Sequence, residues 1–155
     1  MMDRREFAAM MPALLALGST LPTEAEAQAA ALAAKPPAEL KPITSGIVKP
    51  GPVKNGQEGH SSQAFLTGLF TAGNVRFEAH ESVQKPGAPH EAVGTHKHSE
   101  IWYVTKGVAT LYINGTEHRM ETGEVGIVCA GDQHWIANAG DTDLAYFVLT
   151  VGPPE

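Results

Sequence analysis

Residues 101–121 read IWYVTKGVATLYINGTEHRME, and this stretch decides the fold class. It contains three short runs rich in β-branched, aromatic or apolar residues, at 101–105, 108–113 and 117–120. The second and third runs are joined through Asn114-Gly115, the dipeptide best suited to a two-residue type I′ hairpin, because both residues tolerate a positive φ. The stretch therefore predicts consecutive short antiparallel strands.

The same pattern continues on both sides of this stretch. Further runs at 75–83, 125–129 and 144–151 are separated by Gly, Asn and Asp at intervals of roughly ten residues. The alternative fold, an open sheet covered by a helix, lacks a helical pattern of sufficient length after Lys54. We therefore predict an all-β domain that closes into a barrel or a two-sheet jelly roll, since closure protects strand edges.

The composition limits the possible functions. The chain has 155 residues, a formal net charge of −6 and a single Cys. No run of Lys or Arg follows Arg5, so the electrostatic footprint of a nucleic-acid-binding protein is missing. Cys129 alone excludes an intramolecular disulfide and a Cys-based zinc cluster. One domain that depends on its own core is expected.

The first residues resemble an export signal. Arg4-Arg5, Phe7 and the apolar run 8–21 are similar to a bacterial twin-arginine signal peptide. The run is shorter than the ~20 residues that a transmembrane helix requires. We expect cleavage after Ala27 and a periplasmic protein without a membrane anchor. The alternative is an Ala-rich N-terminal segment of a cytoplasmic protein.

Three segments follow from these patterns. Residues 1–27 are the predicted signal peptide, and residues 28–64 are a linker or arm with many prolines and little periodicity. Residues 65–155 are the predicted β-barrel domain.

Candidate metal ligands occur in two separate stretches. His96, His98 and Glu100 share one parity, so an extended chain would point all three side chains the same way. Imidazole and carboxylate groups that converge on one face are metal-ligand chemistry. His134, after a second strand and a Gly turn, supplies a further donor from a distant part of the chain. Such donors accept Fe, Mn, Zn and other divalent ions, so the identity of the metal stays open.

Together the two stretches resemble the signature motifs of the cupin superfamily, which are small jelly-roll β-barrels. Glu100 and Gly107 enclose six residues, as in the second half of the first motif. The second motif is matched at every spacing by Gly123, Gly131, His134 and Asn138. Cys129 stands where the family has Pro. The resemblance covers roughly residues 70–151 and implies a cupin-type jelly-roll β-barrel.

The first motif departs from the family pattern at one ligand. In the family's first motif, three residues usually separate the second His from the Glu, and one residue separates the two His. Counting back from Glu100 therefore places the second His at His96 and the first His at Gly94. Pairing His96 with His98 instead leaves only Ser99 before Glu100, which is too short for a turn between antiparallel strands. We therefore take His96 as the matched ligand.

Two other histidines are candidates to replace the missing ligand. His98 would lie in the turn and His90 on the incoming strand. Without either, the set is two His and one carboxylate with open positions, typical of non-haem Fe(II) chemistry. The predicted ligands are thus His96, His98, Glu100 and His134. The alternative is a barrel that kept its shape and lost the ion, with His134 as a hydrogen-bonded core imidazole.

Other conspicuous side chains receive structural interpretations. By parity Trp102 continues the face of Glu100, whereas Trp135 should face away from its neighbour in the chain. His60, His80 and His118 have no motif context, and we assign them no role.

The resemblance implies a metal-dependent enzyme of the oxygenase, isomerase or lyase type that acts on a small organic molecule. The catalytic residues stay open, and no Ser-His-Asp order supports metal-free covalent catalysis. One alternative is a metal-free periplasmic module that binds or senses a small molecule without turnover. Another is a subunit whose main role is association, because proteins that resemble cupins commonly dimerise, so we expect a homodimer.

Overall fold

The computed structural model describes residues 39–154, which form nine β-strands. The strands are β1 (Val53–Asn55), β2 (His60–Phe70), β3 (Val75–Gln84), β4 (Ser99–Lys106), β5 (Val108–Ile113), β6 (Thr116–Glu121), β7 (Val125–Val128), β8 (His134–Asn138) and β9 (Leu144–Gly152). The predicted signal peptide, residues 1–27, lies outside the described residues. No helix long and apolar enough to cross a bilayer occurs within residues 39–154.

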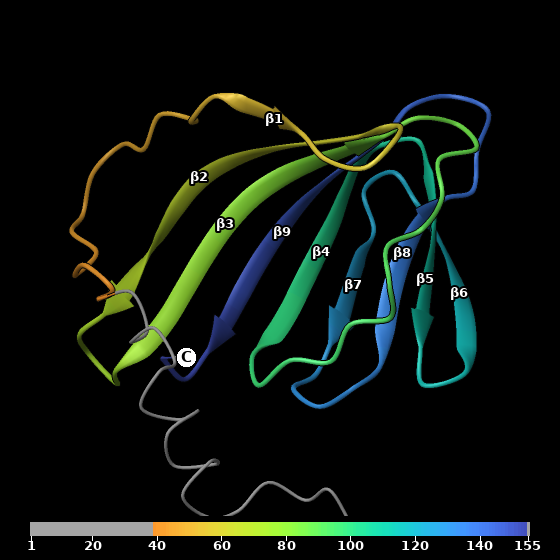
Figure 1. Ribbon diagram of the computed structural model, residues 1–155. Coiled ribbons are helices and arrows are strands. Elements are labelled where there is room, and N and C mark those ends of the chain that lie inside the picture. Colours follow the sequence, from red (N-terminus) through yellow and green to blue (C-terminus); the bar gives the residue numbers. More distant parts are fainter. Residues whose placement is uncertain (1–38, 155) are drawn as a thin grey trace, which may run out of the picture. The chain divides into compact units, whose positions relative to one another are not determined.

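The strands form two antiparallel sheets that face one another (Figure 1). The larger sheet has the order β1-β2-β3-β9-β4-β7, and the smaller has the order β6-β5-β8. The core lies between them and includes Val104 and Tyr146 from the larger sheet and Leu111 and Ile136 from the smaller. This arrangement confirms the predicted all-β jelly roll.

The turn expected at Asn114-Gly115 is present. Asn114 has φ 48° and Gly115 has φ 94°, so both residues occupy the left-handed region that a type I′ turn requires. The hairpin aligns Ile113 with Thr116 and so sets the register of β5 against β6.

The sheet begins earlier than the predicted domain start at residue 65. Residues 60–64 already form the first part of β2, and β1 pairs with it through Val53 and Gln63. Residues 60–64 read HSSQA, so they lack the apolar alternation by which a strand is usually found in a sequence. Of the described part of the predicted arm, residues 39–52 and 56–59 stand outside the named strands, and Pro42 forms a bridge with Leu69.

Strand β3 has two faces of opposite character. The face toward the core is polar and carries Arg76, Glu78, His80, Ser82 and Gln84. The opposite face carries Val75, Phe77, Ala79, Glu81 and Val83. Gln84 is fully buried and accepts a hydrogen bond from the backbone N–H of Asn138 at 2.9 Å, which ties the larger sheet to β8. The interior of the barrel is therefore polar along β3.

Candidate metal centre

The loop from residue 85 to residue 98 brings the candidate ligands together. This loop joins β3 to β4 and runs alongside β8 (Figure 1). Gly94 pairs with His134 on β8 through two backbone hydrogen bonds of 2.8 and 3.1 Å. His96, two residues further along, is thereby held close to the His134 side chain.

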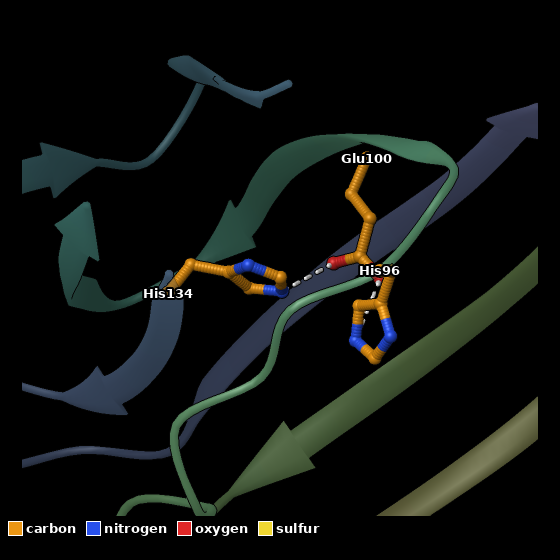
Figure 2. Close-up of side chains that lie close together, drawn as sticks. All are labelled: His96, Glu100 and His134. Atoms are coloured by element: carbon orange, nitrogen blue, oxygen red, sulfur yellow. Dashed lines mark ion pairs between the residues drawn. The ribbon is translucent and has the colours of Figure 1, made fainter. Parts of the chain in front are cut away.

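Three of the four predicted ligands converge (Figure 2). His96, Glu100 and His134 each offer a donor atom, and these atoms lie within 4.8 Å of one another. The Nε2 of His134 lies 3.4 Å from Oε2 of Glu100, and the Nε2 of His96 lies 4.0 Å from Oε1. Glu100 and His134 are buried, whereas the side chain of His96 is 41% exposed. We call these three residues the triad.

His98 lies beside the triad and is not one of its members. Its Nε2 is 3.2 Å from Oε1 of Glu100, and its ring stacks on His96 with centroids 4.6 Å apart and an interplanar angle of 6°. The backbone and Cβ of His98 lie close to Gly152 on β9, where an added Cβ would be 2.6 Å from the Cβ of His98. In this position His98 orients the carboxylate, and its role as a metal ligand stays a prediction.

Gly94 occupies a position from which a side chain would enter the triad. A Cβ added there would lie 3.0 Å from Nε2 of His96 and 3.3 Å from Nε2 of His134. The alignment that placed the family's missing first His at Gly94 is thus consistent with the geometry. His90, the other candidate replacement, stacks on Trp135 with ring centroids 4.4 Å apart. It therefore does not fill this position.

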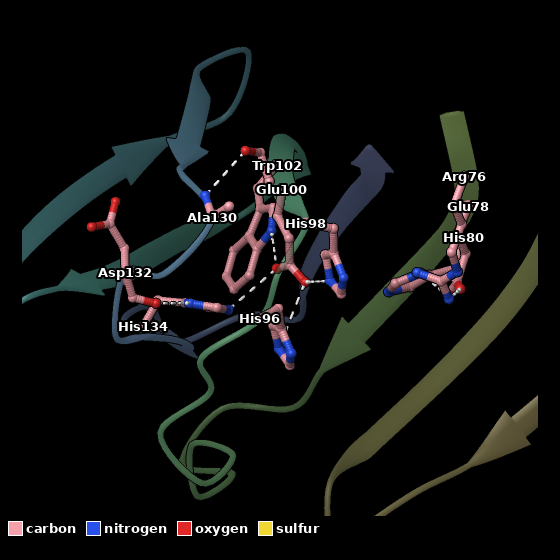
Figure 3. Close-up of polar contacts among 11 residues, drawn as sticks. Arg76, Glu78, His80, His96, His98, Glu100, Trp102, Ala130, Asp132 and His134 are labelled. Carbon is pink, nitrogen blue, oxygen red and sulfur yellow. Dashed lines mark hydrogen bonds and ion pairs between the residues drawn. The ribbon is translucent and has the colours of Figure 1, made fainter. Parts of the chain in front are cut away.

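Neighbouring groups fix the orientation of the ligands (Figure 3). The indole N–H of Trp102 donates to Oε2 of Glu100 at 2.8 Å. The Nδ1 of His134 lies 3.0 Å from the carbonyl oxygen of Asp132 and donates to it, which leaves Nε2 facing Glu100. Ligand histidines in metal sites commonly have this arrangement.

This donor set fits a divalent cation. With Nδ1 of His134 protonated, the lone pair of Nε2 faces a carboxylate oxygen 3.4 Å away. Two electron-rich groups at this distance repel one another unless a cation or a second proton lies between them. Two imidazoles and one carboxylate provide the nitrogen and oxygen donors that Fe, Mn and Zn accept.

A cavity of about 250 Å³ opens onto the triad. Its apolar walls are formed by Trp102, Ile136 and Val148, among others, and its polar lining includes His80, Ser82 and Tyr146. Burial raises the pKa of Tyr146 to about 12, so its hydroxyl keeps its proton. The pKa of Glu78, next to His80 on β3, is lowered by its interaction with His80 and, to a smaller degree, by the Arg76 charge.

His80, Ser82 and Tyr146 had no role predicted from the sequence. A signal was present, because His80 and Ser82 belong to a set of polar residues at every second position of β3. The expected position of Trp102 on the same face as Glu100 is confirmed by the hydrogen bond between them. Trp135, which was expected to face away from His134, contributes to the cavity lining and stacks on Tyr112.

The C-terminal half of the chain is similar to a known family. Residues 80–151 match the family Cupin_2, a cupin domain. Among curated proteins, an oxalate-binding protein from Thermotoga maritima is 33% identical over 66 residues, which is 41% of this chain and 54% of that protein. The chain thus spans about half the length of the curated relative that it matches.

Solved structures show the same fold. An RmlC-like cupin from Shewanella frigidimarina has a TM-score of 0.56 at 17% identity and covers 67% of this chain and 84% of its own. KdgF from Halomonas sp. has a TM-score of 0.58 at 15% identity, with 72% and 96% covered. A structure described as a predicted oxalate decarboxylase from Thermotoga maritima has a TM-score of 0.52 at 21% identity, with 70% and 96% covered. The chain therefore has the cupin-type jelly-roll fold.

Proposed function

We propose that this protein binds a divalent metal ion through His96, Glu100 and His134 and acts on a small organic molecule held in the adjoining cavity. The observation that carries the proposal is the convergence of two imidazoles and one carboxylate within 4.8 Å at the cavity wall. The relative that is named an oxalate-binding protein supports a small carboxylic acid as the ligand.

Three protein donors leave coordination positions open for a ligand. When bound, the metal would supply Lewis acidity or oxygen activation, which suits an oxygenase, isomerase or lyase. The residues of this chain orient and shield the reacting groups. Trp102 holds the Glu100 carboxylate, the carbonyl of Asp132 fixes His134, and the apolar walls limit the access of water.

A second candidate is a metal-free module that binds or senses a small molecule. It is favoured by the contacts that Glu100 already makes, since Trp102 donates to one carboxylate oxygen and His98 lies 3.2 Å from the other. A buried carboxylate with two such partners is tolerated without an ion.

Elemental analysis of protein purified without chelators distinguishes the two candidates. We expect about one equivalent of metal in the wild type and a loss of metal in His134→Ala. Chelation should also lower the thermal stability, because a ligand bound only to the native state stabilises it by RT ln(1 + [L]/Kd). A protein with no metal and no response to chelators would contradict the metal-dependent function and support the metal-free module.

We also propose that the protein is a homodimer. The side of the larger sheet that faces away from the core exposes Tyr103 (45%), Val125 (56%) and Ile127 (60%) on the neighbouring strands β4 and β7. A second copy packed on this face would cover these side chains. Ile127→Lys should give a monomer in analytical ultracentrifugation, whereas Glu117→Lys on the exposed strand β6 should not. A wild-type monomer at micromolar concentration would contradict the proposal.

Export to the periplasm is proposed on the Arg4-Arg5 pair together with Phe7 and the apolar run 8–21. Replacing both residues with Lys should stop export in a bacterial host that uses the twin-arginine route. Export at the normal level would contradict it.

A further inference from the structure

Three hydrogen-bonding side chains line the cavity away from the triad. His80 and Ser82 lie on β3, and Tyr146 lies on β9 opposite Ser82. Strand β9 lies between β3 and the strand that carries Glu100. Neighbouring strands are ~4.8 Å apart, so β3 is about 10 Å from β4. We call His80, Ser82 and Tyr146 the polar wall.

The hydroxyl of Tyr146 is directed by a buried network. The backbone N–H of Asn138 donates to Oε1 of Gln84, which places the Gln84 amide nitrogen toward Tyr146. That nitrogen donates to the Tyr146 oxygen at 2.9 Å. The phenol keeps its proton because burial raises its pKa to about 12. Its O–H is thus a donor for a further acceptor.

His80 is held by charged neighbours on its own strand (Figure 3). Its Nδ1 lies 3.5 Å from Oε1 of Glu78, and the other Glu78 oxygen accepts a hydrogen bond from Arg76 at 2.8 Å. The Glu78 carboxylate favours a proton on Nδ1 of His80. Among residues 39–154 the Glu78 carboxylate is the ion-pair partner of this buried nitrogen.

We infer that the polar wall is a second anchoring site, which binds the distal carboxylate of an organic acid whose other end reaches the triad. The inference rests on the proposed function. The hydroxyls of Ser82 and Tyr146 are donors, the His80 ring is a third hydrogen-bonding group on the same side of the cavity, and a carboxylate is the small group that accepts several hydrogen bonds at once.

The spacing of the two sites selects the length of the acid. Ser82 and Tyr146 lie level with Val104 of β4, four residues along the strand from Glu100, and His80 lies level with Trp102. At ~3.3 Å per residue these offsets are about 7 to 13 Å along the strand. Oxalate is too short to reach both sites, so the expected ligand is a longer dicarboxylate. The cavity volume of about 250 Å³ equals that of roughly eight water molecules at ~30 Å³ each, which accommodates such an acid.

Calorimetric titration with succinate and butyrate tests the inference. The two acids have the same carbon chain, and butyrate lacks the second carboxylate. Wild-type protein loaded with Mn²⁺ should bind succinate at least tenfold more tightly than butyrate. The affinity for oxalate should not depend on the residues of the polar wall. Ser82→Ala and His80→Leu should each reduce the preference for succinate severalfold and leave the affinity for butyrate and the metal content unchanged. His118→Ala, on the exposed strand β6, should change nothing.

Tyr146→Phe should have the largest effect on the preference, but it leaves the buried Gln84 amide without its acceptor and destabilises the fold. Its thermal unfolding is therefore measured alongside. An unchanged preference for succinate in Ser82→Ala and His80→Leu would overturn the inference. If the wild type holds no metal, the proposed function fails by itself. The polar wall would still be supported if metal-free Ser82→Ala and His80→Leu bound succinate more weakly than the metal-free wild type.

Discussion

The triad and the polar wall line one cavity but are built in different ways. The triad takes two ligands from a five-residue stretch, His96 to Glu100, and one from β8. The polar wall takes its residues from β3 and β9, which are more than sixty positions apart in the chain. The ligands of the triad can therefore be found from a sequence motif with fixed spacing. The wall depends on the alternation of side chains along a strand, which many strands share and which does not mark a site. A site of the second kind is visible only after the sheet has been assembled.

The largest expected effect is on the triad. His134→Ala removes a buried donor and should weaken metal binding by more than ~100-fold, since even the loss of a supporting residue around a ligand typically costs ~10–100-fold. Competition with a chromogenic chelator measures the affinity. His118→Ala serves as the control. An equal affinity in His134→Ala would mean that the metal is held elsewhere.

A smaller effect is expected when a ligand loses its support. Trp102→Phe removes the 2.8 Å hydrogen bond to Glu100 and should weaken metal binding by ~10–100-fold. The ring that remains can still pack beside Tyr146, so the fold should persist. Trp135→Phe is the matched control, because its indole makes no hydrogen bond to the triad within the part of the chain that the structure describes. Equal affinities of the two variants would show that the Trp102 contact is not needed.

Gly94→His tests whether the triad lacks a ligand. The new Cβ would lie 3.0 Å from Nε2 of His96 and 3.3 Å from Nε2 of His134, so both rings must shift by a few tenths of an ångström. With that shift we expect metal binding to tighten about tenfold. Gly94→Ala adds the same Cβ without a donor and should weaken binding. If both variants behave alike, the added imidazole does not reach the ion.

The smallest effect concerns the support of the polar wall. His80 and Arg76 lower the pKa of Glu78 in the folded state, so its contribution to stability is present above its ordinary pKa of 4.5 and is lost as the pH falls below it. Glu78→Gln should therefore lower the free energy of unfolding at pH 7 by up to ~1 kcal/mol and flatten its acid dependence.

Urea unfolding of metal-free protein at pH 7 and pH 4 measures this effect, with Glu117→Gln on the exposed strand β6 as the control. An identical loss of stability on acidification in wild type and Glu78→Gln would show that the carboxylate is not stabilised by its neighbours.

The parts of the molecule that sequence predicts are those specified by local chemistry. The β5–β6 hairpin follows from two residues that accept positive φ, and His134 follows from its spacing to three other motif residues. The family spacing also placed Gly94 at the ligand position, where a Cβ would lie 3.3 Å from Nε2 of His134.

The start of β2 and the polar wall could not be predicted in the same way. Residues 60–64 are polar and become a strand only because they pair with β1 and β3. On β3 the alternation shows that one face is polar, but not that this face lines the interior, since polar faces usually meet solvent. His80 therefore received no role, although Glu78 lies two residues away on the same face.

The hydrogen bond between Trp102 and Glu100 also gives the protein an optical reporter. The chain has two tryptophans, and both contribute to the wall of the same cavity. An indole that donates to a carboxylate changes its emission when that carboxylate is drawn to a cation. The tryptophan fluorescence of the protein is accordingly a signal from one place, so titrations of ions and acids can be followed without a label.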